Sequence, residues 1–476
     1  MTAKYLLISV YTIFIIILGL LGHRKTKSFN DFLLGGGKIG PWMTAFSYGT
    51  AYFSAVLFIG FAGKIGWGFG LSSLWIAAGN CLIGTLGVWL VMGNSIKKAA
   101  LKYRVHTMPE FLAARYKSPF LKLFTSSVFF VLLIPYTAAV FMGLSYLFEI
   151  NFNIPYTYVL LFMGMLTGIY LILGGYKSMA MVDVFFGIIM VFGVILLLYS
   201  TVNKAGGMTM LVDKLNSINP GLTSSVGPPG FWALISLVCL TSVAPFAMPQ
   251  LVHKFYSIKD AKAVKIGMIA STVFAALVTG TAYFTGALTR IFINPVNNPG
   301  AFSNGKPIFD ALMPELVATV IPPALTIIIL LLILSASKST LAALVLMSSA
   351  TLTEDLYKGF INKSASDKTL TSMMRICSAV FILLAIILAY LKPAVIVTIL
   401  AISWGGLASV ALGPFIWGLF NRKANGTGAI IAAIGGFGIC LFLFIYWGPS
   451  MVPQAGSIGM LASIILVPLG SVFAKK

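Results

Sequence analysis

Two neighbouring hydroxyl side chains and a lysine stand in the middle of a long apolar segment, in the run Ala336-Ser337-Lys338-Ser339-Thr340. Hydroxyl and carbonyl oxygens are the ligands that hard cations prefer, so this run has the chemistry to hold an alkali cation. At about 100° per residue along an α-helix, Ala336, Ser339 and Thr340 share one face, while Lys338 points roughly the other way. Small hydroxyl residues also pack helices together, so the run fits either an ion site or a helix contact.

Two ionisable side chains are predicted to lie within the membrane. Of the 11 acidic residues, only Asp183 is well inside an apolar segment, and Lys338 is the only basic residue in such a position. A charge near the centre of a membrane helix costs about 2.5 to 3.5 kcal/mol, so each is expected to face protein or a water-filled path. Function is therefore the first hypothesis for both. Because Asp183 is close to Lys177 in the sequence, a position near the membrane surface is its alternative.

The elements that position these groups are predicted from composition. The chain has 476 residues, of which 59% are hydrophobic and 9% are charged, and its mean hydropathy is +0.99. This leaves too little polar surface to cover a water-soluble globule. Because one crossing of a bilayer takes about 20 apolar residues in a helix, we predict an all-α integral membrane protein with about thirteen transmembrane helices. The apolar runs place them at 5–22, 42–63, 70–93, 120–148, 155–174, 177–201, 230–253, 265–288, 322–349, 372–391, 395–420, 426–446 and 457–474.

The formal net charge of +21 comes from an uneven distribution of the 32 lysines and arginines. On the thirteen-helix arrangement most of them fall in loops on one side of the membrane, which by the positive-inside rule is the cytoplasm. This predicts a multi-pass protein of the plasma membrane, with its N-terminus outside and its C-terminus in the cytoplasm. The charge then serves topology and contact with anionic membrane lipids, and nucleic acid is not expected as a partner.

The predicted helices form a single membrane domain, residues 1–476, with an internal symmetry. Residues 42–201 and 230–420 each hold five helices, and because five is odd, the second set enters the membrane from the opposite face. This is the condition for inverted repeats. Residues 5–22 are then an extra N-terminal helix, and residues 426–474 supply two C-terminal helices.

The first helix of each predicted repeat is interrupted. Residues 47–54 are dense in glycine, serine and threonine, and residues 241–250 contain Pro245 and Pro249, each of which removes a helical hydrogen bond. Interruptions at matching positions expose backbone carbonyls and half-helix ends to a site near the membrane midplane. A kinked helix packed against small neighbours is the alternative for either one alone.

The same region supplies candidates for a pocket that binds a small solute. They lie on the two interrupted helices and on the two helices that follow the first, and each has packing as its alternative. None is an arginine, so a carboxylate would need half-helix dipoles or Lys338 to hold it. Amino acids, monocarboxylates and small neutral solutes all remain open. The candidates are Tyr52, Leu57, Asn80, Tyr136, Thr241 and Gln250.

An ordered set of motifs over most of the chain resembles the sodium:solute symporter family, which includes the bacterial proline permease and the sodium-galactose symporters. Any one of these motifs is modest, and their shared order is the stronger signal. They are Thr107-Met108-Pro109-Glu110-Phe111-Leu112 with Arg115-Tyr116, Gly174-Gly175-Tyr176 leading to Asp183, Pro249-Gln250 with Lys254-Phe255, Ser348-Ser349-Ala350 running to Thr353-Glu354-Asp355-Leu356-Tyr357-Lys358, and Trp404-Gly405-Gly406 running to Gly413-Pro414.

The resemblance implies the leucine-transporter fold, in which an added N-terminal helix precedes the five-plus-five inverted repeat and two closing helices follow it. It also implies a sodium site between the first interrupted helix and the eighth core helix. Asp183 matches the acidic residue of the family near the inward exit of the ion. By the same matching, the sodium ligands are the backbone carbonyls of Thr50, Phe53 and Ala336 and the hydroxyls of Ser339 and Thr340.

Two positions depart from the family pattern. Tyr52 stands where the proline permeases carry an acidic residue, which makes proline itself a less expected substrate. Lys338 stands where an apolar residue is usual, and an ammonium there could pair with Asp183 or take the place of the ion. Proton coupling through Lys338 and Asp183 therefore stays open beside sodium coupling.

The sequence therefore predicts a secondary active symporter. It would import a small organic solute, coupled to an inward sodium gradient by alternating access. A proton-coupled symporter of the same fold and a passive channel are the alternatives. An enzyme is not expected, because His23, His106 and His253 all fall at predicted cytoplasmic ends and no catalytic cluster lies within the spans. The expected partners are the solute and membrane lipids, and the oligomeric state is not predicted.

Overall fold

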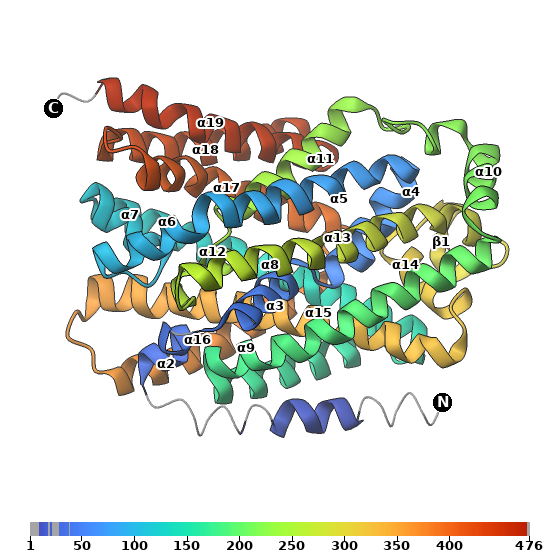
Figure 1. The fold of residues 1–476 in the computed structure, drawn as a ribbon, viewed down its shortest axis with the longest axis horizontal. Coiled ribbons are helices and arrows are strands. Elements are labelled where there is room, and N and C mark those ends of the chain that lie inside the picture. The colour runs from blue at the N-terminus through green and yellow to red at the C-terminus, as the bar shows by residue number, and fades with distance from the viewer. Residues whose placement is uncertain (1–8, 18–19, 21–27, 38, 474–476) are drawn as a thin grey trace.

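The computed structural model describes residues 9–17, 20, 28–37 and 39–473. Over these residues the protein is a bundle of long helices that run roughly along one axis (Figure 1), which confirms the predicted all-α membrane fold. The described residues also contain one small antiparallel sheet of β1 (Phe302–Ser303) and β2 (Lys306–Pro307). Residues 9–17 of the expected helix 5–22 are helical, and all but residue 20 of its remainder lies outside the described residues.

Ten helices among the described residues are long and apolar enough to cross a membrane, and the count of thirteen stays a prediction. The first half of the chain forms α2 (Phe29–Leu34), α3 (Pro41–Tyr52), η2 (Val56–Gly66), α4 (Trp67–Phe69), α5 (Leu74–Cys81), η4 (Leu82–Gly87), α6 (Val88–Tyr103), α7 (Met108–Tyr116), α8 (Pro119–Phe152), α9 (Tyr156–Ala205) and α10 (Met208–Ile218). The second half forms α11 (Phe231–Val243), α12 (Pro249–Ser257), α13 (Ala261–Phe292), α14 (Phe309–Thr319), α15 (Pro323–Ala350), η8 (Thr351–Ile361), α16 (Asp367–Leu391), α17 (Ile396–Phe420), α18 (Gly426–Trp447) and α19 (Val452–Phe473).

Helix α9 has 50 residues and covers two of the expected spans, 155–174 and 177–201. It bends at Gly175, whose φ of 64° and ψ of −172° fall outside helical values. Glycine adopts a positive φ without steric cost. A Cβ at this position would also lie only 3.0 Å from the ring of Phe32, so the glycine lets α2 approach the bend. The two halves of α9 are thus the two predicted helices, joined without a loop.

Both predicted interruptions are present. Helix α3 ends at Tyr52, and the chain leaves helical geometry at Phe53 before η2 continues in the same span. The second interruption separates α11 from α12, where Met248 is extended and Pro249 opens the new helix. Proline lacks the N–H of a continuing helix and forces the preceding residue out of helical geometry, so Pro249 fixes this boundary.

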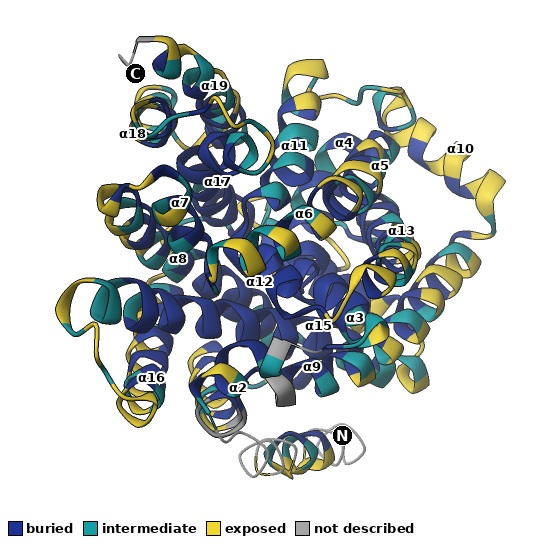
Figure 2. Ribbon diagram, turned by 60° about the vertical axis from the view of Figure 1, so that its left-hand side comes forward, coloured by how far each residue is buried: buried dark blue, intermediate teal, exposed yellow. Residues whose placement is uncertain are grey.

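Helix α15 lies in the interior of the bundle, where it packs against α9, α3 and α8. Its residues from Leu332 to Ala350 are all buried, and Figure 2 shows it in dark blue at the centre. The outer helices α16 and α18 instead expose large apolar side chains such as Leu383 and Phe442, as contact with lipid requires. The polar residues of α15 are therefore surrounded by protein rather than by lipid.

Glycines bring the second half of the first interrupted helix against α13. A Cβ added at Gly66 would overlap the backbone of Gly286, and a Cβ at Gly286 would overlap the backbone of Ala62. Small residues at such crossings let two membrane helices pack backbone to backbone. This contact fixes η2, and hence the interruption before it, relative to α13.

Candidate ion and solute site

Oxygen atoms of α15 and of the first interruption meet at one buried point. The hydroxyl oxygens of Thr50 and Ser339 lie 2.7 Å apart. The Thr340 hydroxyl lies 3.1 Å from the carbonyl oxygen of Thr50 and 3.1 Å from that of Ala336. Phe53 sits at the break itself, with φ of −110° and ψ of 112°, so its carbonyl departs from the α3 direction. All five residues predicted as sodium ligands are buried.

The chemistry of this set suits an alkali cation. It consists of neutral carbonyl and hydroxyl oxygens, and it contains none of the nitrogen or sulfur ligands that zinc and copper favour. The C-terminal end of α3, where its last carbonyls lie, points to these oxygens. This end is the negative end of the helix dipole, which stabilises a cation. The break at Phe53 therefore provides both free carbonyls and a favourable field.

A further hydroxyl of α15 holds the chain just beyond the break. The Ser337 hydroxyl accepts a 3.0 Å hydrogen bond from the backbone N–H of Ala55 and donates one of 2.6 Å to the carbonyl of Ile333. It thereby satisfies a backbone donor that the interruption leaves without a helical partner. Helix α15 thus contacts both sides of the break.

Lys338 turns away from these oxygens. Its ammonium donates to the Met163 carbonyl at 3.2 Å and to the Thr167 hydroxyl at 2.8 Å, both on the first half of α9. The lysine is 1% exposed. Within the described part of the chain it forms no salt bridge, so the pairing with Asp183, one of the two alternatives for Lys338, is not present.

Asp183 lies on the second half of α9 and has other partners. The Ser47 hydroxyl donates to its Oδ2 at 2.5 Å, and the Lys254 ammonium donates to the same hydroxyl at 2.8 Å. Asp183 and Lys254 are both buried. Lys254 is thus a second buried lysine, in addition to Lys338. Ser47 is about one helical turn from Thr50, so this network adjoins the ion ligands.

A small cavity lies next to the break, with a volume of ≈ 30 Å³. Five of the six residues predicted for the solute border it, and Gln250 does not. The remaining walls are mainly apolar and aromatic. The volume holds one or two water molecules, whereas ligand pockets usually exceed about 300 Å³, so solute binding requires the walls to move apart. The predicted residues on the cavity are Tyr52, Leu57, Asn80, Tyr136 and Thr241, and the others are Phe53, Ser54, Val56, Phe61, Tyr283, Leu400 and Trp404.

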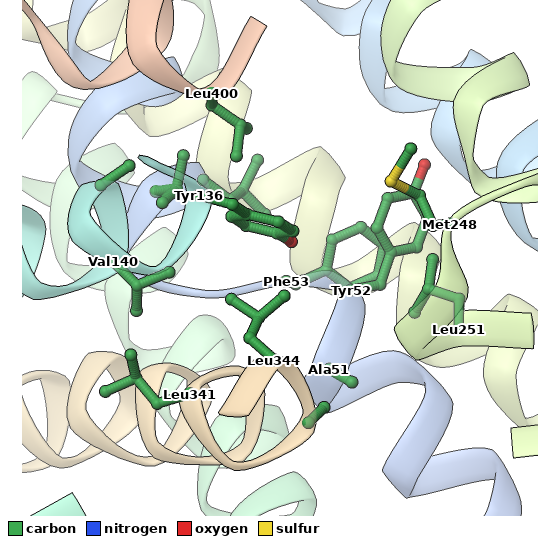
Figure 3. Close-up of a cluster of buried hydrophobic side chains, with 14 of the residues drawn as sticks. Ala51, Tyr52, Phe53, Tyr136, Val140, Met248, Leu251, Leu341, Leu344 and Leu400 are labelled. Carbon is green, nitrogen blue, oxygen red and sulfur yellow. The ribbon is translucent and has the colours of Figure 1, made fainter. Parts of the chain in front are cut away.

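Aromatic rings close this cavity. The Tyr52 ring stacks on Phe53 at 4.3 Å and on Trp404 at 5.8 Å, and Tyr136 meets Trp404 edge to face at 5.8 Å between centroids. Figure 3 shows Tyr52, Phe53 and Tyr136 converging, with Leu400 beside them. A larger space of ≈ 690 Å³ between α9 and α13 is almost wholly apolar and lacks convergent polar groups, so it is a weaker candidate for solute binding.

Several polar atoms around the aromatic cavity make no close hydrogen bond within the described part of the chain. The indole N–H of Trp404 interacts with the Tyr136 hydroxyl, and the Tyr283 hydroxyl with Asn80, but neither contact is a close hydrogen bond. Trp404 and Tyr283 both border the cavity. The amide of Gln250, at the start of α12, likewise interacts with the Tyr136 hydroxyl but makes no close hydrogen bond. Because buried polar groups are normally hydrogen-bonded, these atoms are available to a solute.

The model of the sodium:solute symporter family matches residues 32–436. The chain belongs to this family. Sodium/pantothenate symporter of Escherichia coli (strain K12) is 30% identical over 423 residues, which cover 87% of this chain and 84% of that protein. Sodium/proline symporter of the same strain is 28% identical over 442 residues, covering 89% and 85%.

Solved structures show the same fold. A Na⁺-coupled sialic acid symporter in a substrate-bound outward-open state matches with a TM-score of 0.80 and 18% identity, over 99% of this chain and 97% of that one. MhsT in complex with L-phenylalanine matches with a TM-score of 0.52 and 14% identity, over 90% and 96%. The predicted leucine-transporter fold is thereby confirmed.

As a sodium:solute symporter, the protein is a multi-pass membrane transporter that couples solute movement to sodium by alternating access. Sodium is the transported coupling ion, as the sequence analysis predicted. The proton-coupled alternative relied on Lys338 and Asp183, whose side chains have separate partners in this symporter.

Several residues of the candidate site had no predicted role. Lys254 was placed beyond the end of the span 230–253, but α12 continues to Ser257 and buries it. Ser47 and Ser337 were seen only as members of small-residue runs, and Trp404 only as part of a family motif. The sequence signal for Ser47 was its hydroxyl, one helical turn before Thr50. Neither Ser337 nor Trp404 had a sequence signal of its own.

Proposed function

We propose that this symporter binds sodium where α3 ends against α15. The ligands are the carbonyl oxygens of Thr50, Phe53 and Ala336 and the hydroxyls of Ser339 and Thr340. The convergence of Thr50, Ala336, Ser339 and Thr340 within hydrogen-bond distance is the observation that carries this proposal. When sodium binds, the hydroxyl protons turn outward and the oxygens face the ion. Asp183, which adjoins the site through Ser47, takes part in the release of the ion.

We further infer that the solute is a small carboxylate with an apolar body, such as an amino acid or a monocarboxylate. The relatives are named for proline and pantothenate, which are both carboxylic acids. The cavity has no charged side chain in its walls, so donors must come from elsewhere. Trp404 Nε1, the Gln250 amide and the N-terminus of α12 supply them. The rings of Tyr52 and Tyr136 then cover the apolar body.

Ion and solute are coupled through a short segment of backbone. Thr50 and Phe53 hold the ion, and Tyr52 between them lines the cavity. Sodium binding fixes this segment in one conformation. The pocket is therefore already ordered when the solute binds, and solute binding costs less conformational entropy. By linkage, the solute then raises sodium affinity by the same factor, which typically corresponds to about 1 to 3 kcal/mol.

We also propose the arrangement of the protein in the membrane. Residues 42–201 and 230–420 form the two inverted repeats and rock against each other around the site. The end of the bundle that carries α7 and most lysines and arginines faces the cytoplasm of a plasma-membrane protein. Import then follows the inward sodium gradient.

The test is uptake of a panel of amino acids and monocarboxylates into liposomes, with imposed sodium or proton gradients. The proposal predicts uptake of one carboxylate class, driven by sodium. Ser339→Ala abolishes the sodium response, whereas Ser348→Ala, a buried serine on the same helix, leaves it intact. Uptake that ignores sodium, or a Ser339→Ala variant with wild-type sodium dependence, contradicts the proposed site. Uptake of only uncharged solutes contradicts the proposed substrate class.

A further inference from the structure

A buried positive charge lies next to the proposed sodium ligands, and no carboxylate among the described residues forms a salt bridge with it. Lys338 precedes Ser339 in the chain, and its ammonium is held only by the Met163 carbonyl and the Thr167 hydroxyl among the hydrogen bonds of the described residues. The lysine is 1% exposed, so water does not replace these two contacts. A sodium ion and an ammonium repel each other strongly at short range in a medium of low dielectric constant.

The contact on α9 is arranged to accept an ammonium. The Thr167 hydroxyl donates its own proton to the Met163 carbonyl at 2.7 Å. Its lone pairs therefore face Lys338, and the Met163 carbonyl accepts from both side chains. One threonine thus fixes the orientation of the lysine head group.

The oxygens that would attract a released ammonium belong to the ion site. An ammonium and an alkali cation carry the same charge and take the same kind of oxygen ligand. The ion ligands Ala336, Ser339 and Thr340 all lie within two residues of Lys338, whereas the adjacent Ser337 hydroxyl is already bonded to Ala55 and Ile333. In addition, the buried Asp183 carboxylate interacts with Ser339, and it accepts a hydrogen bond from Ser47, one helical turn before Thr50.

We propose that the Thr167–Met163 contact holds the Lys338 ammonium away from the sodium ligands, and that this restraint sets the sodium affinity of the symporter. The proposal rests on the sodium site proposed above. Lys338 is then neither an ion ligand nor a proton carrier. It is a resident cation that competes with sodium whenever its restraint fails.

The experiment measures the sodium concentration for half-maximal uptake in liposomes for four variants. Thr167→Val removes the hydroxyl but keeps the charge, and it raises this concentration about tenfold, the effect of losing a hydrogen bond to a charged group. Thr167→Ser keeps the hydroxyl and behaves as wild type. Lys338→Met reaches half-maximal uptake at a sodium concentration equal to or below that of wild type, because no competing charge remains. The double variant, Thr167→Val with Lys338→Met, needs the same sodium concentration for half-maximal uptake as Lys338→Met alone.

The double variant separates this role from a structural one. If Thr167 only supported packing, its effect would persist without the lysine, which would overturn the proposal. The proposal also fails if Lys338→Met weakens sodium binding as Thr167→Val does, or if folded Thr167→Val has the wild-type sodium requirement. The two proposals fail separately, since Ser339→Ala with wild-type sodium dependence refutes the ion site itself. Melting temperatures of all variants show whether each one is folded.

Discussion

The phenol of Tyr52 donates a 2.6 Å hydrogen bond to the carbonyl oxygen of Thr241. Tyr52 is the last residue of α3, and Thr241 lies near the end of α11, so this bond joins the two interrupted helices beside the cavity. Because each helix changes direction at its interruption, the bond also fixes how the two breaks face each other. The solute pocket is therefore tied to the backbone that holds the proposed ion.

Replacing Tyr52 with phenylalanine tests this link. The ring remains, but the bond to Thr241 is lost, so the pocket is less well ordered before the solute binds. We expect the KM for solute to rise about fivefold, as the loss of one hydrogen bond of about 1 kcal/mol predicts. Tyr48→Phe is the control, because its hydroxyl bonds the Gly84 carbonyl at 2.8 Å and the residue does not border the cavity. An equal rise in both variants would contradict the assignment.

The ion site makes a different prediction for Thr50. Its proposed ligand is the backbone carbonyl, whereas its hydroxyl donates to the Phe46 carbonyl at 2.7 Å and lies 2.7 Å from the Ser339 hydroxyl. Thr50→Val keeps the carbonyl and should raise the sodium concentration for half-maximal uptake about fivefold, which corresponds to losing the one hydrogen bond that orients Ser339. Ser339→Ala removes a ligand and should have a much larger effect. If Thr50→Val were the more damaging change, the Thr50 hydroxyl would be a ligand.

The sequence predicted the helical fold and pointed to the candidate site because both depend on local signals. Apolar runs define the helices, and Pro249 together with the small residues of 47–54 marks the interruptions. Helical periodicity placed Ser339 and Thr340 on one face, and in the structure both contact Thr50. Features of this kind need no knowledge of which helices are neighbours.

The unpredicted features depend on tertiary contacts. Periodicity placed Lys338 on the other face of α15, but it could not reveal that Thr167 of α9 lies opposite. The burial of Lys254 depends on where α12 ends, and hydropathy locates such ends only within several residues. Trp404 becomes part of the site because α17 packs beside the first interruption, a contact between segments far apart in the sequence.

The buried pair of Asp183 and Lys254, bridged by Ser47, should behave as a unit in stability measurements. Lys254→Met leaves the Asp183 carboxylate buried without its cation, so we expect the free energy of unfolding to fall by about 3 kcal/mol. Adding Asp183→Asn should restore most of this loss, because neither charge then remains. Thermal melting in detergent measures both changes, and Lys259→Met, at an exposed position, serves as the control. Additive effects would show that the two groups are not coupled.

Trp404→Phe tests whether the free indole N–H on the cavity serves the solute. Because Nε1 of Trp404 makes no close hydrogen bond among the described residues and interacts only with the Tyr136 hydroxyl, the substitution should leave the melting temperature nearly unchanged. The KM for solute should rise about tenfold if that N–H binds a carboxylate, since hydrogen bonds to charged groups contribute about 1.5 to 3 kcal/mol. Trp89→Phe is the matched control: its buried Nε1 also lacks a partner, but it packs on Tyr48 and Phe255, away from the cavity. A KM that changes in both variants, or in neither, would remove Trp404 from the proposed carboxylate site.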